Sequence, residues 1–187
     1  MVIVEGMDNS GKTTLVQEIA GLGARIVPSV GKPDREQARL RMQELLNETD
    51  AKVYDRFVAF SDEVYGRVLR GCNILDPDAY GAMLRVMRAN ALVIYCRPPD
   101  DVILNFGDRA QMEGVLERGS TLIRGYDRLF NLLEDWGYAG QIIRYDWTFT
   151  SGYTKKQILE RVKAHLAIEA ENHAYINQLN KGALCLG

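Results

Sequence analysis

The stretch VIVEGMDNSGKTT, residues 2–14, determines how this sequence is interpreted. Residues 2–5 form a short apolar run that predicts a buried strand, and the pattern from residue 12 onward predicts a helix that Gly21 and Gly23 end. Between them, residues 6–13 match G-x-x-x-x-G-K-[ST] at every fixed position. Because this motif binds phosphate when it lies between a strand and a helix, we interpret it as a phosphate-binding loop (P-loop).

Phosphate binding explains each of the fixed residue types of this loop. Two glycines let the backbone curl so that successive N–H groups point at phosphate oxygens, and the helix that follows adds its positive end. Lys12 can reach the β and γ phosphates, and the Thr13 hydroxyl can ligate Mg²⁺. The alternative, a chance match in a glycine-rich turn, is disfavoured by the flanking strand and helix. The motif therefore predicts ATP and Mg²⁺ as cofactors, with a triphosphate site made of Gly6, Asn9, Ser10, Gly11, Lys12, Thr13 and Thr14.

Length and composition indicate a single folded domain over residues 1–187, with 47% hydrophobic residues and a net charge of −2. So small a charge disfavours a long electrostatic track for DNA, although it allows a short basic cleft. The start of the chain does not resemble a signal peptide, and no apolar run is long enough to cross a membrane. Three widely spaced cysteines are typical of reduced thiols, so we expect a cytoplasmic protein.

Apolar runs rich in valine and isoleucine alternate with helical patterns along the chain. We expect strands at 2–5, 24–28, 51–55, 91–96 and 141–146, and helices at 12–20, 34–47, 60–71, 76–90, 120–137 and 154–172. This alternation predicts an α/β fold of the P-loop NTPase type, a three-layer sandwich with a five-stranded parallel sheet and helices on both faces.

Local signals add detail to several of these helices. Asp34, Asp76 and Ser120 are expected N-caps. In the helix at 34–47, Leu40, Leu45 and Leu46 are expected to share the apolar face, with Met42 near its edge. The two tryptophans, Trp136 and Trp147, are expected to pack rather than to stack on a nucleotide.

A second polar pair follows the strand at 51–55. In an open α/β sheet the carboxyl ends of the strands form the ligand-binding edge, so Asp55 and Arg56 should come near the P-loop. Asp55 could hold Mg²⁺ through water, and Arg56 could bind an anionic acceptor. The alternative is a solvated turn with a local ion pair. The absence of an N-K-x-D motif disfavours a GTPase.

In the order of its elements and in two motifs, the chain resembles the thymidylate kinase family. Residues 5–14, EGMDNSGKTT, resemble that family's EGxDxxGKST-type loop, and residues 55–66, DRFVAFSDEVYG, resemble its DRYxxSxxAYQG-type motif. The resemblance implies that Asp8 lies by the acceptor sugar or hydroxyl and Arg56 by the acceptor phosphate. It also implies that Ser61 and Tyr65 line the base pocket, and that the protein could be a homodimer.

A polar segment at 105–119, with three glycines, is a candidate lid. In kinases that the chain resembles, lid arginines close over ATP, which makes Arg109 and Arg118 candidates for binding the transferred phosphate. An exposed loop of mixed charge is the alternative. Arg97 follows a predicted buried strand, so it could either reach the substrate or pair with Asp100 or Asp101.

Two departures from the family pattern leave the acceptor open. Residues 26–37, IVPSVGKPDREQ, lack the arginine that the family places after its second strand, with Lys32 and Arg35 as possible substitutes, and the family's glutamine after Tyr65 is absent. The leading hypothesis is transfer of the γ-phosphate of ATP to a pyrimidine deoxynucleotide such as dTMP. The first alternative is a bacteriophage-type kinase of 5-hydroxymethyluridine in DNA, with Asp8 as proton acceptor. The second is a P-loop ATPase or switch without a small-molecule acceptor.

Overall fold

The fold is built on a five-stranded sheet in which every neighbouring pair is parallel, with the strand order β2-β3-β1-β4-β5. The computed structural model describes residues 1–29, 31, 34–46, 50–107, 111–148 and 152–184. The strands are β1 (Val2–Glu5), β2 (Arg25–Val27), β3 (Lys52–Asp55), β4 (Leu92–Cys96) and β5 (Ile142–Tyr145). The predicted α/β class and five-stranded parallel sheet are therefore confirmed.

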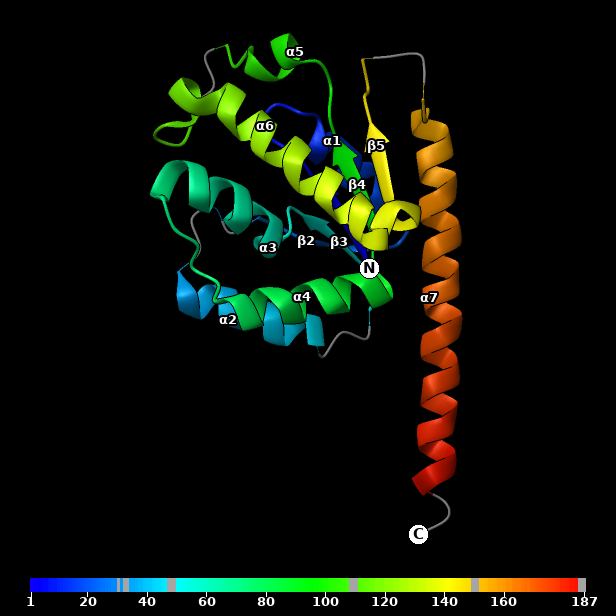
Figure 1. Ribbon diagram of the computed structural model, residues 1–187. Coiled ribbons are helices and arrows are strands. Elements are labelled where there is room, and N and C mark those ends of the chain that lie inside the picture. Colours follow the sequence, from blue (N-terminus) through cyan, green and yellow to red (C-terminus); the bar gives the residue numbers. More distant parts are fainter. Residues whose placement is uncertain (30, 32–33, 47–49, 108–110, 149–151, 185–187) are drawn as a thin grey trace.

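Helices cover both faces of the sheet (Figure 1). One face packs against α1 (Lys12–Ala20) and α7 (Lys155–Leu184), which contribute Leu15, Val16, Ile158 and Val162 to one apolar core. The other core contains residues of α2 (Arg35–Leu46), α3 (Val58–Ser61), η1 (Asp62–Arg70), α4 (Pro77–Asn90), α5 (Asp100–Leu104), α6 (Val115–Leu133) and η2 (Glu134–Tyr138), and η3 (Ala139–Gln141) leads into β5. Among the described residues no helix is long and apolar enough to span a membrane.

The strand register brings the functional edge together. Val4 of β1 lies beside Asp55 of β3, Glu5 lies beside Tyr95 of β4, and Cys96 lies beside Tyr145 of β5. The loops after β1, β3 and β5 therefore leave the sheet from one edge, as expected for a parallel sheet with helical crossovers. This edge holds the candidate site.

Two of the three predicted N-caps are confirmed. The side chains of Asp34 and Asp76 accept hydrogen bonds from Gln37 N and Ala79 N, each at 2.8 Å, which confirms both N-caps. Ser120 is not a cap, because α6 begins at Val115 after Gly114, whose φ is 79°. Residues 115–119 of the predicted lid are thus helical.

The predicted apolar face of α2 was wrong at Leu40, which is 47% exposed. Leu45 is buried as predicted, and Met42, predicted near the edge of the face, packs against the same core. Ala38 is buried in place of Leu40, so the buried positions have a spacing of four and three residues, and the side chain of Leu46 lies outside the described residues. The last helix is longer than the predicted 154–172, and Figure 1 shows α7 extending beyond the rest of the molecule.

Candidate active site

The P-loop adopts a conformation that only glycine accommodates at its first position. Gly6 has a φ of 144°, and a Cβ atom there would lie 2.5 Å from the Cys96 carbonyl oxygen and 2.8 Å from Ser10 Oγ. Gly11 has a φ of 86° and immediately precedes α1. Because the first N–H groups of a helix have no intrahelical acceptor, those of the first turn of α1 are available to an anion at this end.

The side chain of Lys12 folds back against the P-loop. Its Nζ donates to the Met7 carbonyl oxygen at 2.6 Å, and its side chain is buried. Burial, and secondarily the Arg56 guanidinium, lower the pKa of Lys12 to about 8. Ser10 Oγ is also buried and has no hydrogen-bond partner among the described residues. The Lys12 ammonium and the Ser10 hydroxyl could therefore both form new hydrogen bonds to a phosphate bound in the loop.

Asn9 connects the P-loop to α5. Its backbone has a φ of 65°, which asparagine tolerates better than most residues, and its side-chain Nδ2 donates to the carbonyl oxygens of Val102 at 2.7 Å and Asn105 at 2.8 Å. The side chain thus caps the end of α5, where the predicted lid begins. A nucleotide contact of Asn9 is therefore to be expected from its main chain rather than from this amide.

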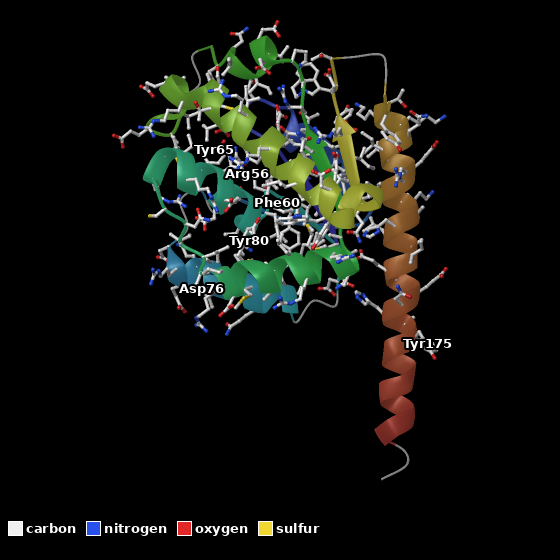
Figure 2. All side chains as sticks on the ribbon, in the orientation of Figure 1. Arg56, Phe60, Tyr65, Asp76, Tyr80 and Tyr175 are labelled. Carbon is white, nitrogen blue, oxygen red and sulfur yellow. The ribbon has the colours of Figure 1, made fainter. Side chains whose placement is uncertain are left out.

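Arg56 faces the P-loop from the end of β3. It has a φ of 73°, its backbone N donates to the Val4 carbonyl oxygen at 3.0 Å, and its guanidinium forms an ion pair with Asp8. The guanidinium carbon lies 4.9 Å from the centre of the Tyr65 ring, and the Tyr65 hydroxyl donates to Asp8 Oδ2 at 3.2 Å. Figure 2 labels Arg56, just after β3, and Tyr65, on η1, next to each other. The result is one cluster, Asp8–Arg56–Tyr65.

Glu5, which the sequence analysis did not single out, lies beneath this cluster and is fully buried. Its Oε1 accepts from Gly6 N at 3.0 Å and from the Tyr126 hydroxyl at 2.9 Å, while its Oε2 accepts from Phe57 N at 2.8 Å and from Ser61 Oγ at 3.5 Å. Burial raises the pKa of Glu5, and Arg56 opposes the rise. Glu5 joins the P-loop, the residues after β3 and α6.

A cleft of about 1370 Å³ runs across this edge of the sheet. Ten predicted site residues line it: Asp8, Asn9, Gly11, Lys12, Thr13, Thr14, Asp55, Arg56, Ser61 and Tyr65. Gly6 and Ser10 are buried behind this lining. Residues of both motifs therefore line one cleft.

Two predicted arginines lie elsewhere, and one lies outside the described residues. Arg97 forms ion pairs with Asp127 and Asp100, so its guanidinium belongs to a network on β4, α5 and α6 and does not line the cleft. Arg118, within α6, donates to the Val68 carbonyl oxygen. Arg109 falls in the segment 108–110, outside the described residues.

Aromatic residues after β5 were missed by the sequence analysis. Trp147 and Tyr153 line the cleft, and Trp147 is 49% exposed. Trp147 Nε1 donates to the Ser10 carbonyl oxygen at 3.1 Å, and a Cβ on Gly11 would lie 2.7 Å from its ring. The expectation that Trp147 serves only packing was incomplete, since one face of the P-loop is bounded by an exposed aromatic ring.

Comparison with solved structures agrees with the fold. The YorR protein of Bacillus subtilis, solved in complex with phosphorylated GDP, superposes with a TM-score of 0.64 and 21% identity, covering 92% of this chain and 97% of that chain. The chain has the P-loop kinase fold. Deoxyadenosine kinase from M. mycoides with bound dATP gives a TM-score of 0.57 and 19% identity, over 86% of this chain and 97% of that chain. No family model and no curated protein sequence matches the chain.

Proposed function

We propose that this protein is an ATP- and Mg²⁺-dependent kinase whose acceptor is a pyrimidine deoxynucleoside unit, either free, as in dTMP, or within DNA, as 5-hydroxymethyluridine. The observation that carries the proposal is that one cleft holds both the P-loop with Lys12 and the pair Arg56 and Tyr65, which face the loop and contact its Asp8. A simple ATPase has no need for the second site, whereas phosphoryl transfer needs donor and acceptor held in line.

The donor side follows from the P-loop. The N–H groups at the start of α1 and the ammonium group of Lys12 would bind the β and γ phosphates of ATP. Thr13 and Asp55 line the cleft, and their hydroxyl and carboxylate oxygens are ligand types that suit Mg²⁺, with water and phosphate oxygens completing the shell. When bound, Mg²⁺ neutralises charge on the phosphates. Bound nucleotides in the two solved neighbours support a nucleotide as donor.

The acceptor side is proposed from the second motif. Ser61 and Tyr65 line the cleft near Arg56, as the resemblance to thymidylate kinases implies for a base pocket. That resemblance supports a pyrimidine base. The proposed lid at 105–119 begins at Asn105, whose carbonyl oxygen accepts from the Asn9 side chain of the P-loop, and its residues 108–110 lie outside the described residues. Closure of this lid would exclude water from the transferred group.

Label transfer tests this proposal. The purified protein is incubated with γ-labelled ATP, Mg²⁺ and, in separate reactions, deoxynucleoside monophosphates, deoxynucleosides, and DNA with or without hydroxymethyluracil. Labelled acceptor is the expected result, and Lys12→Ala should abolish it because the phosphates lose their main cation. Release of free phosphate at a rate that no acceptor changes would contradict the proposal and favour the ATPase or switch.

A further inference from the structure

The arginines in the acceptor half of the cleft are held in ion pairs. This half consists of Asp8 together with the cleft-lining residues that follow β3, namely Asp55, Arg56, Ser61, Asp62, Tyr65, Leu69 and Arg70. Among the described residues that line it, the guanidinium groups are those of Arg56 and Arg70, and each forms an ion pair with a carboxylate, Asp8 and Asp62 respectively. The described lining of the acceptor half therefore carries no surplus of positive charge.

The second pair is fixed within η1. The Asp62 carboxylate is fully buried and also accepts from Ile74 N and Leu75 N at 3.0 Å. Arg70 packs so closely over Gly66 that a Cβ there would lie 2.8 Å from its guanidinium and 2.9 Å from Asp62 Oδ1. With its carboxylate partner held by two further backbone donors, Arg70 is constrained to this position.

A phosphate acceptor fits these charges poorly. A nucleoside monophosphate brings a charge of about −1.5 to −2 at neutral pH and needs cations that are free to meet it. Arg56 already neutralises Asp8, so a phosphate at Arg56 would lie beside that carboxylate and be repelled by it. The two anions would then share one guanidinium, so each would be only partly neutralised.

A hydroxyl acceptor fits the same geometry well. A hydroxyl is neutral when it binds, and it must lose a proton as it attacks phosphorus. Asp8 is 33% exposed in the cleft and belongs to the loop that binds the donor. Arg56 contacts its Oδ1 and Tyr65 its Oδ2, which fixes the carboxylate but leaves further lone pairs for a substrate O–H.

We infer that the accepting group is a hydroxyl and that Asp8 receives its proton; this inference rests on the kinase function proposed above. The hydroxyl oxygen forms a bond to Pγ, the bond between Pγ and the β–γ bridging oxygen breaks, and the hydroxyl proton passes to the Asp8 carboxylate. The products are a phosphate monoester and ADP. A sugar hydroxyl of a deoxynucleoside and the hydroxymethyl group of a modified base share this chemistry.

Product identity in the wild-type protein decides the question without any variant. Thymidine, dTMP, duplex DNA containing hydroxymethyluracil and the same duplex containing thymine are each incubated with γ-labelled ATP and Mg²⁺, and products are separated by chromatography. Label in a monoester of thymidine, or in the hydroxymethyluracil DNA alone, supports the inference and identifies the source of the hydroxyl. Labelled dTDP as the main product overturns the inference but leaves the kinase function standing, and no labelled acceptor overturns both.

Asp8→Asn tests the role of the carboxylate with the hydroxyl acceptor so identified. We expect kcat to fall by about 10²–10⁴-fold, the range for loss of a general base, while KM for ATP changes by less than about threefold. Asp78→Asn, an exposed carboxylate on α4 outside the cleft lining, should leave both constants unchanged. Tyr65→Phe keeps the ring under Arg56 but removes the bond to Oδ2, so it should lower kcat more modestly. An Asp8→Asn protein that retains wild-type kcat refutes the inference.

Discussion

Replacing Glu5 with glutamine tests how the site is held together, since the change keeps the shape of the side chain and alters only its hydrogen bonding and charge. Four donors reach the two carboxylate oxygens, two on each. Glutamine converts one oxygen into an NH₂ group, whichever way the amide is turned. The Tyr126 and Ser61 hydroxyls can rotate to accept from that group, whereas the N–H of Gly6 or Phe57 cannot.

The magnitude follows from this count. One buried N–H loses its acceptor, which costs about 1–3 kcal/mol, and the remaining bonds lose a charged partner, roughly 1 kcal/mol more. We therefore expect the free energy of unfolding to fall by about 2–4 kcal/mol, which for a domain of this size lowers Tm by roughly 5–15 °C. The chain should still fold, because domains typically have about 5–15 kcal/mol of stability.

Urea and thermal unfolding followed by circular dichroism measure the effect. Tyr126→Phe is the matched control, because it removes one donor to Oε1 and leaves every backbone N–H with its acceptor. It should lower the free energy of unfolding by about 1 kcal/mol. The reasoning is refuted if the free energy of unfolding of Glu5→Gln lies within about 0.5 kcal/mol of the wild-type value. In that case the four donors do not stabilise the carboxylate, and the proposed junction between the P-loop, the residues after β3 and α6 is wrong.

Three further predictions follow from the cleft. The pKa of Lys12 is about 8, and only its ammonium form binds phosphate well. ATP binding at pH 8 should therefore take up about half a proton, and the affinity for ATP should fall above that pH. Calorimetry in buffers of different ionisation enthalpy measures both the proton uptake and the affinity. Asn9→Ala should be about 1 kcal/mol less stable than Asn9→Gly in urea unfolding, since both lose the bonds to α5 but alanine also disfavours a φ of 65°. Trp147 bounds the P-loop at the cleft, so ATP should change the intrinsic fluorescence of Trp136→Phe but not of Trp147→Phe.

Each of these predictions has a result that contradicts it. Heats of ATP binding that do not depend on the buffer at pH 8 would show that Lys12 is already fully charged, and Lys12→Arg provides the reference for a permanent charge. Equal stability of the two Asn9 variants would mean that the backbone relaxes at this position. A signal that survives in Trp147→Phe would place the fluorescence change at Trp136, which is 55% exposed.

The parts of the site that could be predicted are those whose chemistry is local in the sequence. The P-loop is a contiguous motif between a strand and a helix, and Asp55 and Arg56 directly follow an apolar strand, so the parallel-sheet rule alone brings them to the same edge. The same locality explains the correct caps at Asp34 and Asp76, where each side chain bonds a backbone N three residues later.

The parts that were missed depend on contacts between distant segments. Trp147 lies 136 residues after Gly11, and no local pattern distinguishes a tryptophan that bounds a phosphate loop from one that packs. Glu5 looked like the polar end of a strand, whereas three of its donors come from two distant segments of the chain, the residues after β3 and α6.

The start of α6 was predicted wrongly because Gly119 is needed for a tertiary contact that the local sequence does not show. Its presence in a polar segment suggested a loop and moved the expected helix start to Ser120. In the structure Gly119 is buried inside α6, where a Cβ would lie 2.5 Å from Leu104 Cδ2 and 3.5 Å from Met7 Cε. The glycine therefore serves the close approach of α6 to α5 and to the P-loop, not a turn. Since helix interiors lose about 1 kcal/mol for a glycine, such a position is kept helical by packing that the sequence does not display. The same contact places Gly119, at the end of the candidate lid, against Met7 of the P-loop.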